Sequence, residues 1–142
     1  MNRQTKRTHG PGERRELSMK MIPLLTIVAS VLLSALSQIL LKTGMVSNGV
    51  RRAIAEGDPL PIVAAVATTP SILLGFMCFG LSVLMWLMVL ARTPLSTAYP
   101  FVALGIALTV AAGVVLFAEP LSIQKIAGVA LIIIGIVTVA SA

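Results

Sequence analysis

The sequence is poor in charged residues, in aromatic residues and in cysteine. Charged residues make up 11% of the 142 residues and aromatic residues 4%, whereas hydrophobic residues make up 57% and the mean hydropathy is +0.99. A soluble domain carries about 25% charged residues, so this chain has too few to cover a water-facing surface. The composition excludes an ordinary soluble enzyme and predicts one all-α integral membrane domain, with the lipid bilayer as its main partner.

Residues that bind metals or catalyse reactions are equally scarce. There is one cysteine, Cys78, and one histidine, His9, so neither a disulfide nor a Cys/His metal site can form within the chain. Glu119 is the one acidic residue after Asp58, which leaves no pair of carboxylates for acid–base catalysis. We therefore expect no catalytic site, no metal and no cofactor, and we do not expect an enzyme.

Long uncharged runs predict the membrane-spanning helices. The first runs from Met21 to Leu41, and twenty-one residues at about 1.5 Å each cross the roughly 30 Å hydrocarbon core. It is longer than the apolar region of a cleavable signal peptide, about 7–15 residues, so we expect a retained helix. The sequence predicts a four-helix membrane domain over residues 21–142, with transmembrane helices at about 21–42, 71–91, 95–118 and 122–141.

The connection between the first two spans has two parts. Residues 47–59 contain Asn-Gly, Arg-Arg and Gly-Asp-Pro, which predict a loop. Residues 60–69 are apolar but too short to cross a membrane, and Pro70 interrupts them. We expect these residues to form an interfacial segment or a lead-in to the second span.

Positive charge is concentrated at the N-terminus. Six of the eleven Lys and Arg residues lie within residues 1–20, namely Arg3, Lys6, Arg7, Arg14, Arg15 and Lys20. No basic face recurs later, so we expect no nucleic-acid partner; a disordered cytoplasmic tail that contacts anionic lipid is favoured. With four spans, seven basic residues lie on the side of the tail and four on the other, which places both termini in the cytoplasm. Without the tail the balance reverses, which leaves dual insertion open.

Small hydroxyl side chains recur on one face of the first span, at spacings of four, four and three: Thr26, Ser30, Ser34 and Ser37. Gln38 flanks the same face. Polar side chains within a span turn away from lipid, toward another helix or a wet cavity. Two interpretations stay open for the serines: they line a substrate path, or they only let helices pack closely. The amide of Gln38 is larger, and its hydrogen-bonding groups are harder to satisfy by helix packing alone. For Gln38 we therefore favour a position on a substrate path.

Glycines in two spans differ in their spacing. Gly128 and Gly135 in the last span are seven residues apart, so they share one stripe that permits close approach of another helix. This stripe predicts a dimer interface, with packing inside one chain as the alternative. Gly75 and Gly80 in the second span are five residues apart and share no face, so no role is predicted for them.

Three stretches together resemble a known transporter family. Residues 31–42 read VLLSALSQILLK, residues 86–100 read WLMVLARTPLSTAYP and residues 116–128 read LFAEPLSIQKIAG. They resemble the drug/metabolite transporter superfamily in its short four-helix form, which is small multidrug resistance-like or EamA-like. The resemblance is strongest to the subunits that flip aminoarabinose-linked undecaprenyl phosphate, and it covers roughly residues 22–141. It implies a bacterial inner-membrane transporter, built as a homodimer or from two paired four-helix subunits.

The resemblance also implies where the substrate passes. In the proton-coupled multidrug branch a glutamate lies eight residues before the lysine that ends the first helix, and Ser34 has that position here. Ser34, Gln38 and Tyr99 look instead like the flippase branch. The expected substrate path comprises Ser30, Ser34, Ser37, Gln38, Lys42 and Tyr99. Lys42 and Arg92 are candidate contacts for a phosphate head group on opposite sides of the membrane, although an ordinary interfacial position is favoured for Arg92.

We therefore expect a flippase or transporter subunit for a polyprenyl-phosphate-linked sugar or a similar amphiphile. Two alternatives stay open. One is a small-cation or metabolite exporter of the same superfamily. The other is an accessory subunit that does not transport but stabilises a membrane glycosyltransferase complex.

Overall fold

The described part of the chain consists of helices joined by short turns. The computed structural model describes residues 11–140, and this part of the chain contains no strand. Its helices, in chain order, are α1 Pro11–Met45, α2 Asn48–Glu56, α3 Pro59–Thr68, α4 Pro70–Leu90, α5 Leu95–Phe117 and α6 Ile123–Ala140. The predicted all-α class is confirmed for these residues.

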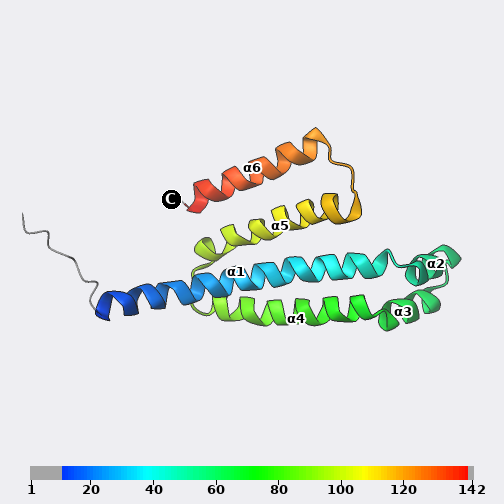
Figure 1. Cartoon of the computed structure of the whole chain (residues 1–142), viewed down its shortest axis with the longest axis horizontal. Coiled ribbons are helices and arrows are strands. Elements are labelled where there is room, and N and C mark those ends of the chain that lie inside the picture. The colour runs from blue at the N-terminus through cyan, green and yellow to red at the C-terminus, as the bar shows by residue number, and fades with distance from the viewer. Residues whose placement is uncertain (1–10, 141–142) are drawn as a thin grey trace, which may run out of the picture.

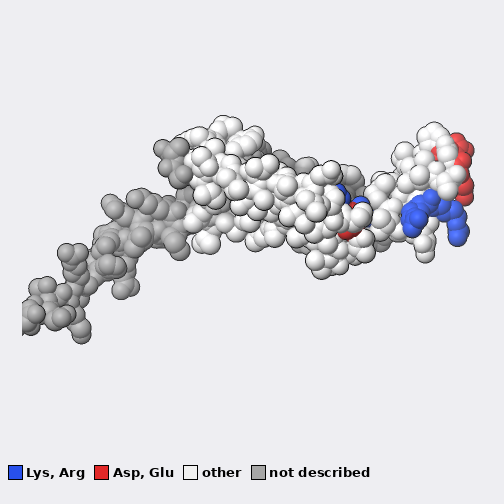
Figure 2. Space-filling view, turned by 90° about the horizontal axis from the view of Figure 1, so that it is seen from above, with Lys and Arg blue, Asp and Glu red and all other residues white. Residues whose placement is uncertain are grey.

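The four long helices lie side by side, and the two short ones extend one end of the bundle (Figure 1). α1 lies between α4 and α5, and α6 packs on the far side of α5. Figure 2 shows that charged side chains on the visible face gather at the end that carries α2 and α3, and at one spot just before it. The rest of the described surface in that view is uncharged, as expected of a surface that faces lipid.

Within the described residues, three helices are long and apolar enough to cross a membrane. They are Ile22–Met45 within α1, Pro70–Leu90 and Leu95–Phe117. These segments match the first three predicted spans to within three residues at each end. α6 is apolar but shorter, so a fourth crossing remains a prediction.

α1 begins earlier than the sequence predicts. The sequence predicts a start at Met21, after a disordered tail, but the helix begins at Pro11, ten residues earlier. Proline is favoured at the first helical position, because its missing N–H would have no partner there. The prediction followed the charge of this segment and overlooked its helix-forming residues. The remainder of the predicted tail, residues 1–10, lies outside the described residues.

The predicted loop at residues 47–59 is wrong, because it contains α2. One face of this short helix is buried, with Val50 0% and Ala53 7% exposed, while Arg51 and Arg52 are exposed. The helix ends at Gly57, whose φ of 79° is a left-handed conformation that glycine adopts without strain. Polar composition suggested a loop, but spacing of three between Val50 and Ala53 is the amphipathic signal that was present.

The segment after it, α3, agrees with the prediction of a short apolar lead-in. It begins at Pro59 and ends at Thr68, and α4 begins two residues later at Pro70. Proline is tolerated at these first positions because the first amide groups of a helix have no partner within it. The two prolines therefore set the junction between α3 and the span that follows.

Close contact between α1 and α4 depends on two glycines. A Cβ atom on Gly75 would lie 2.8 Å from Cγ of Leu41 and 3.1 Å from the backbone nitrogen of the same residue. A Cβ atom on Gly44 would lie 2.9 Å from the Ser71 hydroxyl oxygen and closer still to Ile72. Both glycines are buried. Gly75, for which the sequence predicts no role, is therefore a packing residue.

The glycines of α6 have no such neighbour. Within the described residues, nothing lies within 4 Å of the position that a Cβ atom would take at Gly128 or Gly135. Gly135 is also exposed. Packing of this stripe against the rest of the described chain is therefore excluded, and its role in a dimer remains a prediction.

Candidate functional site

The polar face of α1 lines a pocket between α1, α4 and α5. The pocket is partly open and has a volume of about 370 Å³. Its polar lining residues are Ser30, Ser34, Gln38, Ser82 and Thr109, and its apolar walls include Phe79, Trp86, Val102 and Ile106. Three of the predicted path residues, Ser30, Ser34 and Gln38, are thus brought to one cavity.

The hydroxyl groups of Ser30 and Ser37 donate their protons to carbonyl groups of α1 and so present oxygen lone pairs. The Ser30 hydroxyl donates to the carbonyl of Ile27 at 2.8 Å, and the Ser37 hydroxyl donates to the carbonyl of Ser34 at 2.6 Å. A serine that donates to its own helix can still accept a hydrogen bond from a ligand. Ser37, however, is fully buried and lines neither pocket, so the structure favours the packing interpretation for this residue.

A second, smaller pocket continues from the first. It has a volume of about 200 Å³ and lies between α1, α5 and the connection from α5 to α6. Gln38 and Thr109 line both pockets, so the two adjoin. Lys42 and Glu119 lie in the wall of the second pocket. Ser30, Ser34, Gln38 and Lys42 therefore form a polar column, spaced four residues apart, that runs through both pockets.

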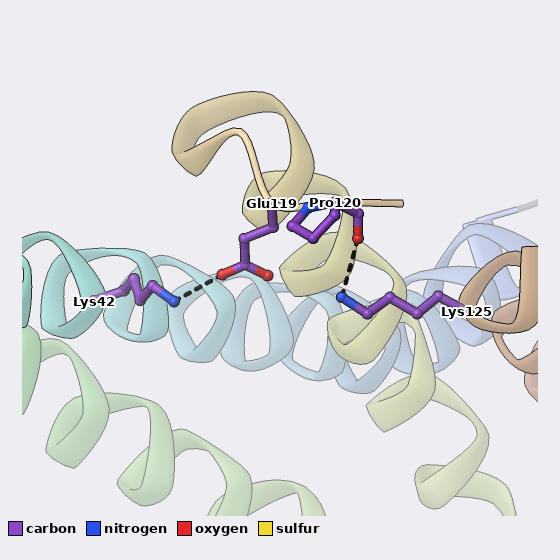
Figure 3. Close-up of polar contacts among 4 residues, drawn as sticks. All are labelled: Lys42, Glu119, Pro120 and Lys125. Carbon is purple, nitrogen blue, oxygen red and sulfur yellow. Dashed lines mark hydrogen bonds and ion pairs between the residues drawn. The ribbon is translucent and has the colours of Figure 1, made fainter. Parts of the chain in front are cut away.

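Lys42 is paired with an acid that comes 77 residues later in the chain. Figure 3 shows the Lys42 side chain reaching toward Glu119, and the Lys42 Nζ donates a hydrogen bond to the Glu119 Oε1 at 2.7 Å. The side chains are 46% and 38% exposed, so the pair stays accessible from the pocket. The Lys42 Nζ also lies 5.7 Å from the centre of the Phe117 ring, within reach of a cation–π contact.

The electrostatics of this pair are dominated by Lys42. Its hydrogen bond, and then its charge, lower the pKa of the Glu119 carboxyl below the ordinary value. The charge of Lys125 adds to this lowering, although its own Nζ donates to the Pro120 carbonyl at 3.1 Å (Figure 3). Glu119 is therefore an ionised carboxylate at neutral pH.

The turn after α5 holds Glu119 in place. Ala118 has a φ of 50°, a left-handed conformation, and the amide groups of Ala118 and Glu119 both donate to the carbonyl of Gly113. A Cβ atom at Gly113 would lie 2.9 Å from the Glu119 Oε2. The carboxylate thus rests on Gly113, which leaves room for it because it has no side chain.

The two remaining predicted residues lie near the opposite end of the α1–α4 pair. Arg92 follows the C-terminus of α4, is exposed, and makes no ion pair with any described residue. Tyr99 lines neither pocket and is 55% exposed, but its ring makes an edge contact with Trp86 of the first pocket, with centroids 6.1 Å apart. The structure therefore separates Arg92 from the pockets and connects Tyr99 to them only through Trp86.

Glu119 is the residue that sequence reasoning missed. The sequence marks it as the last acidic residue, but a partner so distant along the chain leaves no local pattern. Within residues 11–140, no three His, Cys, Asp or Glu side chains gather closely enough to hold a metal ion. The chemistry available at this site is hydrogen bonding and charge pairing.

Known proteins resemble this chain over most of its length. A family model described as Small Multidrug Resistance protein matches residues 62–132. A relative from Aeromonas hydrophila, named as the ArnF subunit of a 4-amino-4-deoxy-L-arabinose-phosphoundecaprenol flippase, is 36% identical over 120 residues, covering 81% of this chain and 77% of its own. One from Pseudomonas savastanoi, named as subunit ArnE of such a flippase, is 33% identical over 112 residues, covering 79% and 91%. No solved structure matches the chain significantly.

Proposed function

The chain belongs to the Small Multidrug Resistance protein family, and from this premise we propose that it is one subunit of a bacterial inner-membrane flippase. Its substrate is a polyprenyl-phosphate-linked sugar or a similar amphiphile. The observation that carries the proposal is the polar column from Ser30 to Lys42, which passes through two adjoining pockets of the bundle. The relatives ArnE and ArnF are named as probable flippase subunits for a lipid whose head group carries a sugar amine and a phosphate.

The shape of the pockets suits an amphiphile. A polar head group in the membrane needs hydrogen-bonding partners, because hydrocarbon offers none. Ser34, Gln38 and Thr109 supply such partners, while a partly open pocket leaves the polyprenyl chain in the bilayer. Lys42 is placed to contact the phosphate, since charge-assisted contacts are the strongest that a phosphate can make. Arg92, far from both pockets, is assigned an interfacial position instead.

We assign the functional unit to a dimer of four-helix chains, either two copies or a pair of related subunits. Within one chain, the buried share of the most apolar stretch is only 28%, 22% and 11% for the three candidate spans. A single copy therefore encloses little of a path. α6 crosses the membrane as the fourth span, and its Gly128 and Gly135 are free to meet a partner helix. The positive-inside rule then places both termini in the cytoplasm, and Lys42 and Glu119 on the opposite side.

The test measures the rate at which a labelled polyprenyl-phosphate-linked sugar moves between the leaflets of reconstituted vesicles, with and without a paired subunit. Lys42→Gln is expected to slow this movement by about ten-fold, the size of one hydrogen bond to a charged group. Lys42→Arg keeps the charge and is expected to retain most of the rate, and Arg92→Gln is the matched control. Equal rates for Lys42→Gln and Lys42→Arg would make Lys42 an ordinary interfacial residue. Movement no faster than in empty vesicles would refute the function itself.

The rival function, proton-coupled export of small cations, makes a different prediction. Such exchange needs a carboxylate whose pKa is raised within a span, and the three spans identified in the described residues contain no Asp or Glu. The Ser34 hydroxyl does not titrate near neutral pH. Vesicles with the protein should therefore show no internal pH change when quaternary ammonium compounds are added. A robust pH change would favour the exporter, and Glu119 would be the next residue to substitute.

A further inference from the structure

The Lys42–Glu119 pair lies where a substrate head group would end its path along the polar column. We propose that the two side chains act together as a receptor for a head group that carries both a phosphate and an ammonium. In this exchange Lys42 leaves Glu119 for the phosphate, and Glu119 leaves Lys42 for the ammonium. The inference rests on the proposed flippase function, and it adds Glu119 as a specificity-determining residue.

The pair is accessible enough to exchange partners. Both side chains line the pocket of about 200 Å³, and each keeps more than a third of its surface exposed. Ion pairs at this level of exposure contribute little to stability, because water competes for both charges. Opening the pair therefore costs little, and an incoming head group with two charges can replace both contacts at once.

Because both charges are present, we expect an anionic head group alone to fit poorly. A phosphate that took Lys42 would leave the Glu119 carboxylate unpaired beside it, and the two negative charges would repel. The charge of Lys125 also acts on Glu119, but its Nζ donates to the Pro120 carbonyl at 3.1 Å. A head group that brings its own ammonium removes the conflict, so the site selects for that charge combination.

The surroundings place both charged groups beside the second pocket. The Glu119 carboxylate rests on Gly113, and its backbone amide is tied to the Gly113 carbonyl at 3.1 Å. Lys42 lies against the face of Phe117, and the same ring can receive an ammonium. Gln38 and Thr109, at the junction of the two pockets, are placed to bond hydroxyl groups of a sugar. Every group of an aminosugar phosphate thus has a partner of suitable chemistry.

The test compares two probes on the full-length protein in detergent or nanodiscs. Both are short-chain polyprenyl phosphates that carry one pentose; in one probe a sugar carbon bears an amino group and in the other a hydroxyl. The wild type is expected to bind the amino probe about ten-fold more tightly, as for one hydrogen bond between charged groups. Glu119→Gln is expected to abolish this preference while the hydroxyl probe still binds. Lys125→Gln, on the same connection, is the matched control and should keep the preference.

A shorter acid keeps the test decisive if Glu119→Gln assembles poorly. Glu119→Asp retains the charge but withdraws it by one methylene, so the preference should shrink without vanishing. A preference that survives in Glu119→Gln would overturn the proposal and leave the pair as a structural contact, with the flippase function untouched. A wild type that binds both probes equally would overturn it too. If neither probe binds the wild type, the proposed function fails and this inference fails with it.

Discussion

In the α1–α4 half of the bundle, Gly44 and Gly75 allow close contact between two helices, whereas a Cβ atom at Gly128 or Gly135 of α6 would meet no described neighbour within 4 Å. The two halves are joined by packing of α5 on α1 and by the Lys42–Glu119 pair. Glycine therefore lies in a packed contact between helices in one half, and on a helix face without a described neighbour in the other. One half is closely packed within the chain, and in the other half the glycine stripe of α6 meets no described residue.

The largest effect is expected from adding a methyl group at Gly75, where α1 and α4 are in close contact. Gly75→Ala places a Cβ atom against the Leu41 backbone, which cannot swing aside, and overpacking of this kind costs about 1–3 kcal/mol of unfolding free energy. Gly80→Ala is the matched control, because nothing lies within 4 Å of its Cβ position. Unfolding in mixed micelles measures both. Equal stability of the two variants would mean that the packing of α1 on α4 does not require the close contact at Gly75.

A smaller effect, and of a different kind, is expected in the α5–α6 half. Gly135→Leu adds bulk where nothing in the described chain is disturbed, so the stability of one chain should stay near that of the wild type. Its dimer should weaken by about ten-fold in dissociation constant, equivalent to about 1.4 kcal/mol. Cross-linking or light scattering in detergent measures the dimer fraction. An unchanged fraction would move the interface away from the glycine stripe of α6.

The link between the halves can be loosened at Gly113. A Cβ atom there would lie 2.9 Å from the Glu119 Oε2, and the flexible carboxylate would move away from Lys42. We expect Gly113→Ala to weaken the pair with only a slight loss of stability, since the displaced atoms are the end of a side chain. Glu119→Gln should then change the melting temperature less in this background than in the wild type. An equal change in both backgrounds would mean that Gly113 does not seat the carboxylate.

The smallest effect concerns pH. Lys42 lowers the pKa of Glu119, so the stabilisation from their pairing is fully present above the ordinary pKa of glutamate and is lost as the pH falls through the lowered value. The wild type and Glu119→Gln should therefore differ in melting temperature at neutral pH and converge in acid. A difference that persists at low pH would require another cause than charge pairing.

Sequence patterns predicted the parts of this structure that depend on one helix at a time. Uncharged runs located the spans of α1, α4 and α5, and the four-residue spacing placed Ser30 and Ser34 on the pocket side of α1. What the sequence did not predict depends on neighbours. The contact of Gly75 with Leu41 and the pairing of Lys42 with Glu119 join helices that are distant along the chain. The prediction of a loop in place of α2 failed for a second reason, because the polar composition of the segment outweighed its short amphipathic pattern.

The polar column also has a handedness. An α-helix turns about 100° per residue, so residues four apart advance by about 40°, and the three steps from Ser30 to Lys42 advance by about 120° over about 18 Å. The pockets agree with this rotation, because the first has walls from α4 and α5, while α4 contributes nothing to the second and the α5–α6 connection takes its place. If the proposed function holds, a head group that follows the column rotates by about a third of a turn as it advances. It passes from the first pocket, which α4 and α5 wall, to the second pocket, which Glu119 walls.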